Sequence, residues 1–313
     1  MQNVVTVTLN PAFDVHFELE RFELGKENYS SKRIVHAGGK GLNISRALRM
    51  NGIDSLAFIV LGEDDAAEFQ VQLDAENLNY RAFLCPGSVR HNITIHPAEG
   101  PETRLSLDTF HMDRSLFQEI TDQLLPLIHP GVVAAYGGRL PKGLPLEAVK
   151  ELFTALKERG ALLVLDCNNL SLQDLAEIKP WLIKPNEYEA EALLGRKIST
   201  DDEVLRSAEE IHGLGVENVL ISLGERGLAY AGREMGGWAR VPQITPASTI
   251  GAGDSTLAGF IFAHLQGGDG AEKLKTAAAF GTAACLTPGT QPPKPEAIAQ
   301  ITAQVKVDIL NFC

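Results

Sequence analysis

Short apolar runs alternate along the chain with longer segments in which apolar residues recur every three or four positions. The runs predict strands buried on both faces, and the periodic segments predict amphipathic helices. The expected strands lie at 4–9, 55–60, 132–136, 161–166, 181–185 and 218–224. The expected helices lie at 41–50, 64–77, 145–160, 200–215, 253–266 and 271–285. This repeated order predicts an α/β fold with a mainly parallel sheet covered by helices on both faces.

Two stretches depart from the order of strand and helix. Residues 12–36 and 90–108 contain short alternating segments, such as VHFELERF and HNITIH, with no helical pattern between them. They predict a small β-sheet inserted into the main fold, serving as a lid or a dimer surface. Because there is no internal repeat and no low-complexity linker, we expect one domain over 1–313.

Composition narrows the possible partners. The chain has 313 residues and a net charge of −12, which excludes nucleic acid and anionic membrane surfaces because these require a basic face. A small anionic ligand stays possible, since a few local cations can override the global sign. Four scattered cysteines (Cys85, Cys167, Cys285 and Cys313) show no metal-binding spacing and predict free thiols. With neither a signal-peptide pattern nor an apolar run of about 18 residues, we expect a cytoplasmic protein.

In open parallel sheets, ligands bind at the carboxyl ends of the strands. Polar, glycine-rich loops follow five of the predicted strands, and they read TLNPAFD, GGRLPKG, DCNN, KPNEYE and SLGERG. We therefore expect the functional residues to gather along that edge of the sheet.

The stretch TIGAGDSTLAGF, residues 249–260, places three small residues and then Asp254 at the start of a predicted helix. It is not a dinucleotide fingerprint, because Thr256 stands where the third glycine belongs, and neither it nor AGGKG has Walker A spacing. Bare amides at a helix N-terminus suit a phosphoryl oxygen. By this stretch alone, Asp254 is either a first-turn acid that offsets the helix dipole or a catalytic group.

TIGAGDSTLAGF together with AGGKGLN, residues 37–43, resembles the paired signatures of the ribokinase-like (PfkB-type) carbohydrate kinases. The opening TLNPAFD, residues 8–14, resembles the phosphosugar branch, which contains 1-phosphofructokinases, tagatose-6-phosphate kinases and minor 6-phosphofructokinases. The resemblance covers nearly the whole chain and implies a three-layer α/β/α fold. It also implies ATP and Mg²⁺, and transfer to a phosphorylated ketohexose. Fructose 1-phosphate, giving fructose 1,6-bisphosphate, is the first choice, with tagatose 6-phosphate and fructose 6-phosphate as alternatives.

The resemblance assigns the catalytic step to Asp254, which would accept the proton of the attacking sugar hydroxyl. Phosphoryl transfer needs alignment, charge neutralisation and a group that orients the nucleophile, so a carboxylate suits this position. The amides of Gly251, Ala252 and Gly253 would form an anion hole for the transferring group.

The resemblance also implies the nucleotide and metal contacts. Asn186 and Glu189 would organise magnesium through water, with Asp166 as a further acid of that network. The alternative is that Asn186 caps a helix and Glu189 is its partner. The positions implied for the nucleotide are Lys184, Asn186, Ser222, Gly224, Gly227, Thr249 and Gly281.

The acceptor sugar would be held by Asp14, Gly38, Gly39 and Asn43. A phosphate on the acceptor requires cations, and the candidates are Lys26, Lys40, Arg90 and Arg104. For each of these cations the alternative is a solvated surface charge.

One stretch departs from the family pattern. Relatives carry S-G-S-L-P after the strand that ends near 136, whereas this chain reads Gly137-Gly138-Arg139-Leu140-Pro141. Arg139 either adds a phosphate contact or reshapes the pocket. A rival of a different class is therefore a non-catalytic sugar-phosphate sensor on the same fold. The inserted sheet leads us to expect a homodimer.

Overall fold

The computed structural model describes residues 3–107, 111–167, 169–233 and 235–311. Its central sheet has ten strands in the order β14-β13-β12-β11-β10-β9-β8-β1-β4-β5. The strands are β1 (Val4–Thr8), β4 (Leu56–Gly62), β5 (Tyr80–Cys85), β8 (Val133–Gly137), β9 (Leu162–Asp166), β10 (Leu182–Ile183), β11 (Asn218–Ser222), β12 (Leu228–Gly232), β13 (Met235–Arg240) and β14 (Lys306–Asn311). Pairing is parallel from β5 through β11 and antiparallel from β11 to β14.

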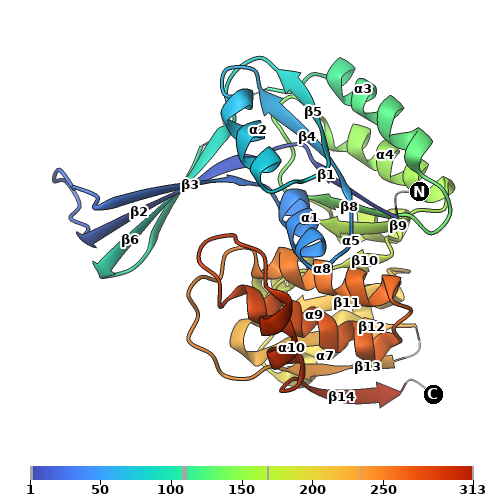
Figure 1. The fold of residues 1–313 in the computed structure, drawn as a ribbon. Coiled ribbons are helices and arrows are strands. Elements are labelled where there is room, and N and C mark those ends of the chain that lie inside the picture. Colours follow the sequence, from blue (N-terminus) through green and yellow to red (C-terminus); the bar gives the residue numbers. More distant parts are fainter. Residues whose placement is uncertain (1–2, 108–110, 168, 234, 312–313) are drawn as a thin grey trace.

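Helices cover both faces of this sheet (Figure 1). The first face carries α3 (Arg114–Leu124), the 3₁₀ turn η1 (Leu125–Leu127), α4 (Leu146–Glu158), α5 (Leu172–Ile178), α6 (Glu187–Leu194) and α7 (Asp201–Gly213). The second carries α1 (Lys40–Met50), α2 (Ala66–Ala75), α8 (Ala252–Leu265), α9 (Gly270–Ala284) and α10 (Pro295–Thr302). A second 3₁₀ turn, η2 (Gly224–Arg226), joins β11 to β12.

The strands divide their side chains between the two cores. Val5 and Val7 of β1 pack into the first core, while Val4 faces α1 and α8 in the second. Because alternate residues of a strand point to opposite faces, a continuous apolar run is what a doubly covered strand requires. The structure therefore confirms the predicted three-layer α/β/α fold.

A small four-stranded sheet projects from the main body (Figure 1). Its order is β3-β2-β6-β7, formed by β2 (Ala12–Arg21), β3 (Lys32–Gly38), β6 (Arg90–Glu99) and β7 (Thr103–Ser106). The base of this small sheet is anchored by Phe13, whose ring lies 5.1 Å from that of Phe69 on α2. β2, β6 and β7 lie within the two stretches expected to form an insertion, whereas β3 extends two residues beyond the first stretch, to Gly38. Residue 108 of the second stretch lies outside the described residues.

No strand was predicted where β5, β12, β13 and β14 lie. β12 and β13 read LAYAG and MGGWAR, in which glycine and alanine are frequent and β-branched residues are absent. Strand β10 covers only two residues of the five expected, between Pro180 and Pro185, which cannot donate to a strand ladder. Across the described residues, no helix combines the length and the apolar character that crossing a membrane requires.

Candidate active site

A cleft of about 510 Å³ lies at the carboxyl ends of β1, β8, β9 and β10, between the start of α8 and the base of the small sheet. It brings together most of the residues expected at the site. These are Asp14, Gly39, Lys40, Asn43, Arg90, Arg104, Arg139, Asp166, Lys184, Asn186, Glu189, Thr249, Gly251, Gly253 and Asp254.

The N-terminus of α8 forms one wall of the cleft. Gly251 adopts φ +77°, a left-handed conformation that favours glycine, and the helix begins at Ala252. The first backbone N–H groups of a helix have no partner within it, so this turn presents donors to the cleft. The Ala252 N–H is directed at the Thr249 carbonyl, 3.4 Å away, so this amide is partly engaged already.

Asp254 is a buried carboxylate in this first turn. Its Oδ2 accepts a hydrogen bond of 2.8 Å from Asn43 Nδ2 on α1, and the N-cap residue of α8 is Gly251 rather than Asp254. Burial and the negative charge of Asp166 raise the pKa of Asp254 to about 7, against the opposing charges of Lys40 and Lys184. A general base works best with a pKa near the operating pH. The geometry therefore favours a chemical role over capping.

Lys40 spans the floor of the cleft. Its Nζ lies 2.9 Å from Oδ1 of the buried Asp166. Burial alone would lower the pKa of Lys40, but the charges of Asp166 and Asp254 outweigh burial and raise it. The site therefore places one cation between two acids.

One side of the cleft is built on β2 and β6. Asp14 and Asn92 are register partners, and Asn92 Nδ2 donates to Asp14 Oδ1 at 2.9 Å. Burial raises the pKa of Asp14, while Asn92 and Arg90 oppose that shift. A Cβ on Gly38 would lie 2.0 Å from Asp14 Oδ2, so only glycine leaves room for this carboxylate.

Three arginines line the cleft and differ in their hydrogen-bond and ion-pair partners. Arg90 donates to the Asn10 carbonyl and to Asn92 Oδ1, and Arg104 pairs with Glu102 at 2.6 Å. Arg139 is exposed and has no hydrogen-bond or ion-pair partner within the described ranges. It is the freest of the three to meet an anion.

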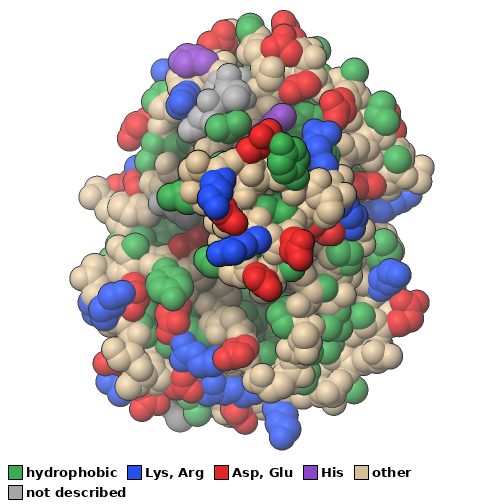
Figure 2. Space-filling model, turned by 90° about the vertical axis from the view of Figure 1, so that its left-hand side faces the viewer, with side chains coloured by type: hydrophobic (Ala, Val, Ile, Leu, Met, Phe, Trp, Pro, Cys, Tyr) green, Lys and Arg blue, Asp and Glu red, His purple; other side chains and the backbone are tan. Residues whose placement is uncertain are grey.

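Lys26, predicted to belong to this site, does not line the cleft. It lies in the turn between β2 and β3 at the far end of the small sheet, exposed and paired with Glu23. Strand β2 runs for ten residues, which carries the turn away from Asp14 at the start of that strand. Figure 2 views this side of the molecule and shows acidic and basic side chains intermixed.

Asn186 and Glu189 form the capping box of α6. Asn186 Oδ1 accepts from the Glu189 N–H at 2.9 Å, and Glu189 Oε2 accepts from the Asn186 N–H at 2.8 Å. The capping alternative is thus observed, yet both side chains also line the cleft. Lys184, on the same loop, approaches α8 so closely that a Cβ on Gly253 would lie 2.8 Å from its Nζ.

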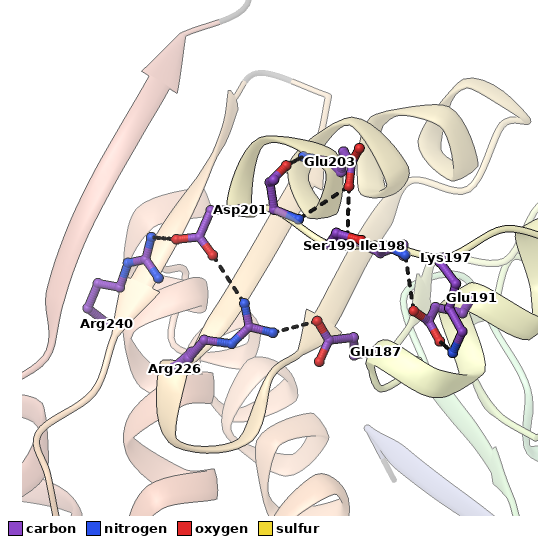
Figure 3. A network of polar contacts seen from close by, with 10 residues as sticks. Glu187, Glu191, Lys197, Ile198, Ser199, Asp201, Glu203, Arg226 and Arg240 are labelled. Carbon is purple, nitrogen blue, oxygen red and sulfur yellow. Dashed lines mark hydrogen bonds and ion pairs between the residues drawn. The ribbon is translucent and has the colours of Figure 1, made fainter.

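The loop after β11, expected to hold the nucleotide, is tied to α6. Ser222 and Asn186 form an isolated parallel β-bridge, and the Ser222 N–H donates to the Pro185 carbonyl at 3.0 Å. Arg226 pairs with both Glu187 on α6 and Asp201 on α7 (Figure 3). These contacts fix the loop against the helix that carries Glu189.

Ser222 and three of the glycines expected at the nucleotide site lie outside the residues that line the cleft. A Cβ on Gly227 would lie 2.0 Å from the Ala239 carbonyl oxygen, so close packing of β13 accounts for this glycine. Gly281 is buried between α9 and α8, where a Cβ would lie 2.2 Å from Thr256 Oγ1. Gly224 has φ +59° and open space around it.

Sequence reasoning did not single out Asn92 or Arg46. The alternating pattern HNITIH could have identified Asn92, because Asn92 and Asp14 share a face once β2 and β6 are paired. Arg46 lies one turn beyond Asn43 on α1, and its spacing places it on the same face of the helix.

Residues 7–297 match the model of the pfkB family carbohydrate kinases. A 1-phosphofructokinase of Haemophilus influenzae is 32% identical over 90% of both chains. A tagatose-6-phosphate kinase of Staphylococcus epidermidis is 32% identical over 89% of this chain and 90% of its own. The crystal structure of phosphofructokinase-2 from Escherichia coli in complex with potassium superimposes with a TM-score of 0.90 at 25% identity, covering 97% and 99% of the two chains. The chain therefore belongs to the pfkB family of carbohydrate kinases.

Proposed function

We propose that this kinase transfers the γ-phosphoryl group of ATP to a phosphorylated ketohexose, with fructose 1-phosphate as the preferred acceptor and fructose 1,6-bisphosphate as the product. The observation that carries the proposal is the position of Asp254. It is a buried carboxylate in the first turn of α8, in a cleft that also presents Arg90, Arg104 and Arg139. The names of the relatives, 1-phosphofructokinase and tagatose-6-phosphate kinase, support a sugar phosphate as acceptor.

In the proposed reaction, Asp254 accepts the proton of the acceptor hydroxyl as that oxygen attacks the γ-phosphorus. The bond between the γ-phosphorus and the β,γ-bridging oxygen breaks, and ADP leaves with the electron pair. Oδ2 of Asp254 is engaged by Asn43, which leaves Oδ1 to receive the proton. In this proposal the N–H groups of Gly251, Ala252 and Gly253 neutralise charge on the transferring group.

The carboxylates of Asp166 and Glu189 suit magnesium held through water. Both line the cleft, and within the described residues no three His, Cys, Asp or Glu side chains are grouped to hold a metal directly. Mg²⁺ keeps several waters and is shared with substrate phosphates, so two carboxylates are enough. When bound, the ion would neutralise phosphate charge, and Lys184 would add a contact to the nucleotide phosphates.

Arg139 and the neighbouring arginines supply the cations that a phosphorylated acceptor requires. Tagatose 6-phosphate and fructose 6-phosphate remain the alternative acceptors, because each carries a phosphate for which Arg90, Arg104 and Arg139 are the candidate cations. The non-catalytic sensor is disfavoured, since Asp254, Lys40, Asp166 and Lys184 are all present around the same cleft.

We also propose that two copies associate through the small sheet. Large exposed apolar side chains lie on two parts of it: Leu24 and Tyr29 in the turn between β2 and β3, and Leu105 and Leu107 in and just after β7, of which Leu105 is 52% exposed. The intermixed charges on this side allow a self-complementary contact (Figure 2). Sedimentation should give a dimer that Leu105→Glu dissociates; a monomeric wild-type protein would contradict the proposal.

The substrate assignment is tested by ADP release with ATP and Mg²⁺ against a panel of acceptors. The panel contains fructose 1-phosphate, fructose 6-phosphate, tagatose 6-phosphate, fructose and tagatose. We expect kcat/KM to be highest for fructose 1-phosphate and lower by at least about a hundredfold for the free sugars, because the cations then lack a partner. A free sugar as the best acceptor would refute the assignment, and no turnover with any acceptor would favour the sensor.

A further inference from the structure

We propose that Arg46 is a positioning residue that orients the side-chain amide of Asn43 and, through it, the carboxylate of Asp254. This inference rests on the proposed function, in which Asp254 receives the proton. Arg46 does not line the cleft; its side chain is 5% exposed and lies behind Asn43 on α1.

A continuous chain of hydrogen bonds connects the three helices. Arg46 Nε donates to Glu76 Oε2 at 2.6 Å, at the C-terminal end of α2. Arg46 Nη1 donates to Asn43 Oδ1 at 3.1 Å, and Asn43 Nδ2 donates to Asp254 Oδ2 at 2.8 Å on α8. The buried base is thus linked to a half-exposed acid on the far side of α1.

The chemistry of the guanidinium fixes the direction of this chain. A guanidinium has only donors, so the Asn43 atom that faces Arg46 must be the amide oxygen. The amide nitrogen is then turned toward Asp254, where it donates. With the amide reversed, its oxygen would face a carboxylate oxygen, and two acceptors would repel each other. Arg46 therefore keeps one oxygen of Asp254 occupied and the other free for the acceptor hydroxyl.

Structural packing alone gives little reason for an arginine here. Burying a guanidinium carries a desolvation cost, and Arg46 Nη2 has no hydrogen-bond partner among the residues that the structure describes. Its charge also favours the ionised form of Asp14, another acid of the cleft. A lysine ammonium cannot reproduce the planar fork that meets Glu76 and Asn43 together. These features point to the orientation of Asn43 as the reason for the residue.

The proposal is tested by a double-mutant cycle on the full-length enzyme, with ADP release as the assay. We expect Arg46→Met to lower kcat/KM for the sugar phosphate about tenfold, with the KM for ATP changed less than about twofold. In an Asn43→Ala background the same substitution should have no further effect, because its route to Asp254 is already lost. Equal losses in both backgrounds would overturn the proposal, since they would show a structural effect independent of Asn43.

Three further variants keep the result unambiguous. Arg46→Lys should recover less than half of the loss, and full recovery would contradict the need for a fork. Arg49→Met, an exposed arginine on the same helix, should leave the kinetics unchanged. If Arg46→Met does not fold, Glu76→Leu replaces it in the cycle, because Glu76 is 40% exposed and its loss releases Arg46 from the other side.

Asp254→Asn is assayed alongside to separate the two proposals. If Asp254→Asn retains turnover, the proposed base fails, and the role of Arg46 fails with it. If Asp254→Asn is inactive while the effects of Arg46 and Asn43 add independently, only the positioning role is overturned.

Discussion

Lys40 Nζ lies 2.9 Å from Asp166 Oδ1 on the floor of the cleft, joining the start of α1 to the end of β9 across 126 positions of sequence. Asp254 feels both charges: Asp166 raises its pKa, and Lys40 lowers it. Burial has the largest effect on the pKa of the proposed base, and the two charges of the ion pair add opposing effects to it.

The pH dependence of kcat/KM should report this balance. Burial and Asp166 raise the pKa of Asp254 to about 7, and only the carboxylate can accept a proton. We expect log kcat/KM for the sugar phosphate to rise with unit slope up to about pH 7 and then level off. The measurement is initial ADP release from about pH 5 to 9 at constant ionic strength.

The acid limb of this pH profile is the part over which log kcat/KM rises with pH. Two substitutions should shift it in opposite directions along the pH axis. Asp166→Asn removes a negative neighbour and should shift the limb to lower pH, whereas Lys40→Met removes a positive neighbour and should shift it upward. Both variants are expected to be slower than wild type. Shifts in the same direction, or a limb that does not move, would exclude Asp254 as its origin.

The free energy of unfolding should also depend on pH through the raised pKa of Asp254. Because the folded-state pKa of Asp254 lies above its ordinary value of 3.8, the folded protein holds a proton that the unfolded chain releases. Stability contributed by this group is present below pH 3.8 and is lost as pH rises through about 7. We expect Asp254→Asn to raise the free energy of unfolding by about 4 kcal/mol at pH 8 and by about 2 kcal/mol at pH 5. Denaturant unfolding at both values checks this, and a gain independent of pH would contradict it.

Gly253 tests the contact between α8 and the proposed nucleotide lysine. An alanine Cβ there would lie 2.8 Å from Lys184 Nζ and 3.2 Å from its Cε, so the lysine must move. We expect Gly253→Ala to raise the KM for ATP about tenfold. Gly213→Ala is the matched control, because Gly213 is also helical and has open space around its Cα. The control should stabilise the fold by about 0.5 kcal/mol and leave both KM values unchanged; similar kinetics for both variants would count against Lys184.

Arg139 tests the acceptor side. It lines the cleft, is exposed, and has no ionic partner among the described side chains. We expect Arg139→Ser to raise the KM for the sugar phosphate about tenfold and the KM for ATP less than twofold. Equal increases in both would remove Arg139 from the sugar pocket.

The three layers of the fold could be predicted from the sequence because apolar runs and helical periodicity are local patterns. The polar residues at the strand ends could be found for the same reason. Strand β9 ends at Asp166, Lys184 directly follows β10, and Asp254 lies in the first turn of α8. The α/β topology alone therefore gathers these three residues at one edge of the sheet. Arg46 and Asn92 were missed because spacing shows which face each residue occupies, but not that α1 packs against α2 and α8 or that β2 pairs with β6.

The places of Lys26 and of two glycines depend on information that the sequence does not contain. Lys26 was grouped with the other cations because its distance along the small sheet cannot be read without the length of β2. Gly227 and Gly281 were predicted at the nucleotide site, and in the structure they pack closely against Ala239 and Thr256. A glycine in a sequence shows that something approaches closely and does not show what.

Turnover by Asp254→Asn tests the central claim most directly. The substitution keeps the size of the side chain and removes the ability to accept a proton at neutral pH. We expect kcat with ATP and fructose 1-phosphate to fall by at least about a thousandfold, while nucleotide binding measured by calorimetry stays within about threefold of wild type. A variant that binds ATP normally and retains more than about a tenth of the wild-type kcat would contradict the account.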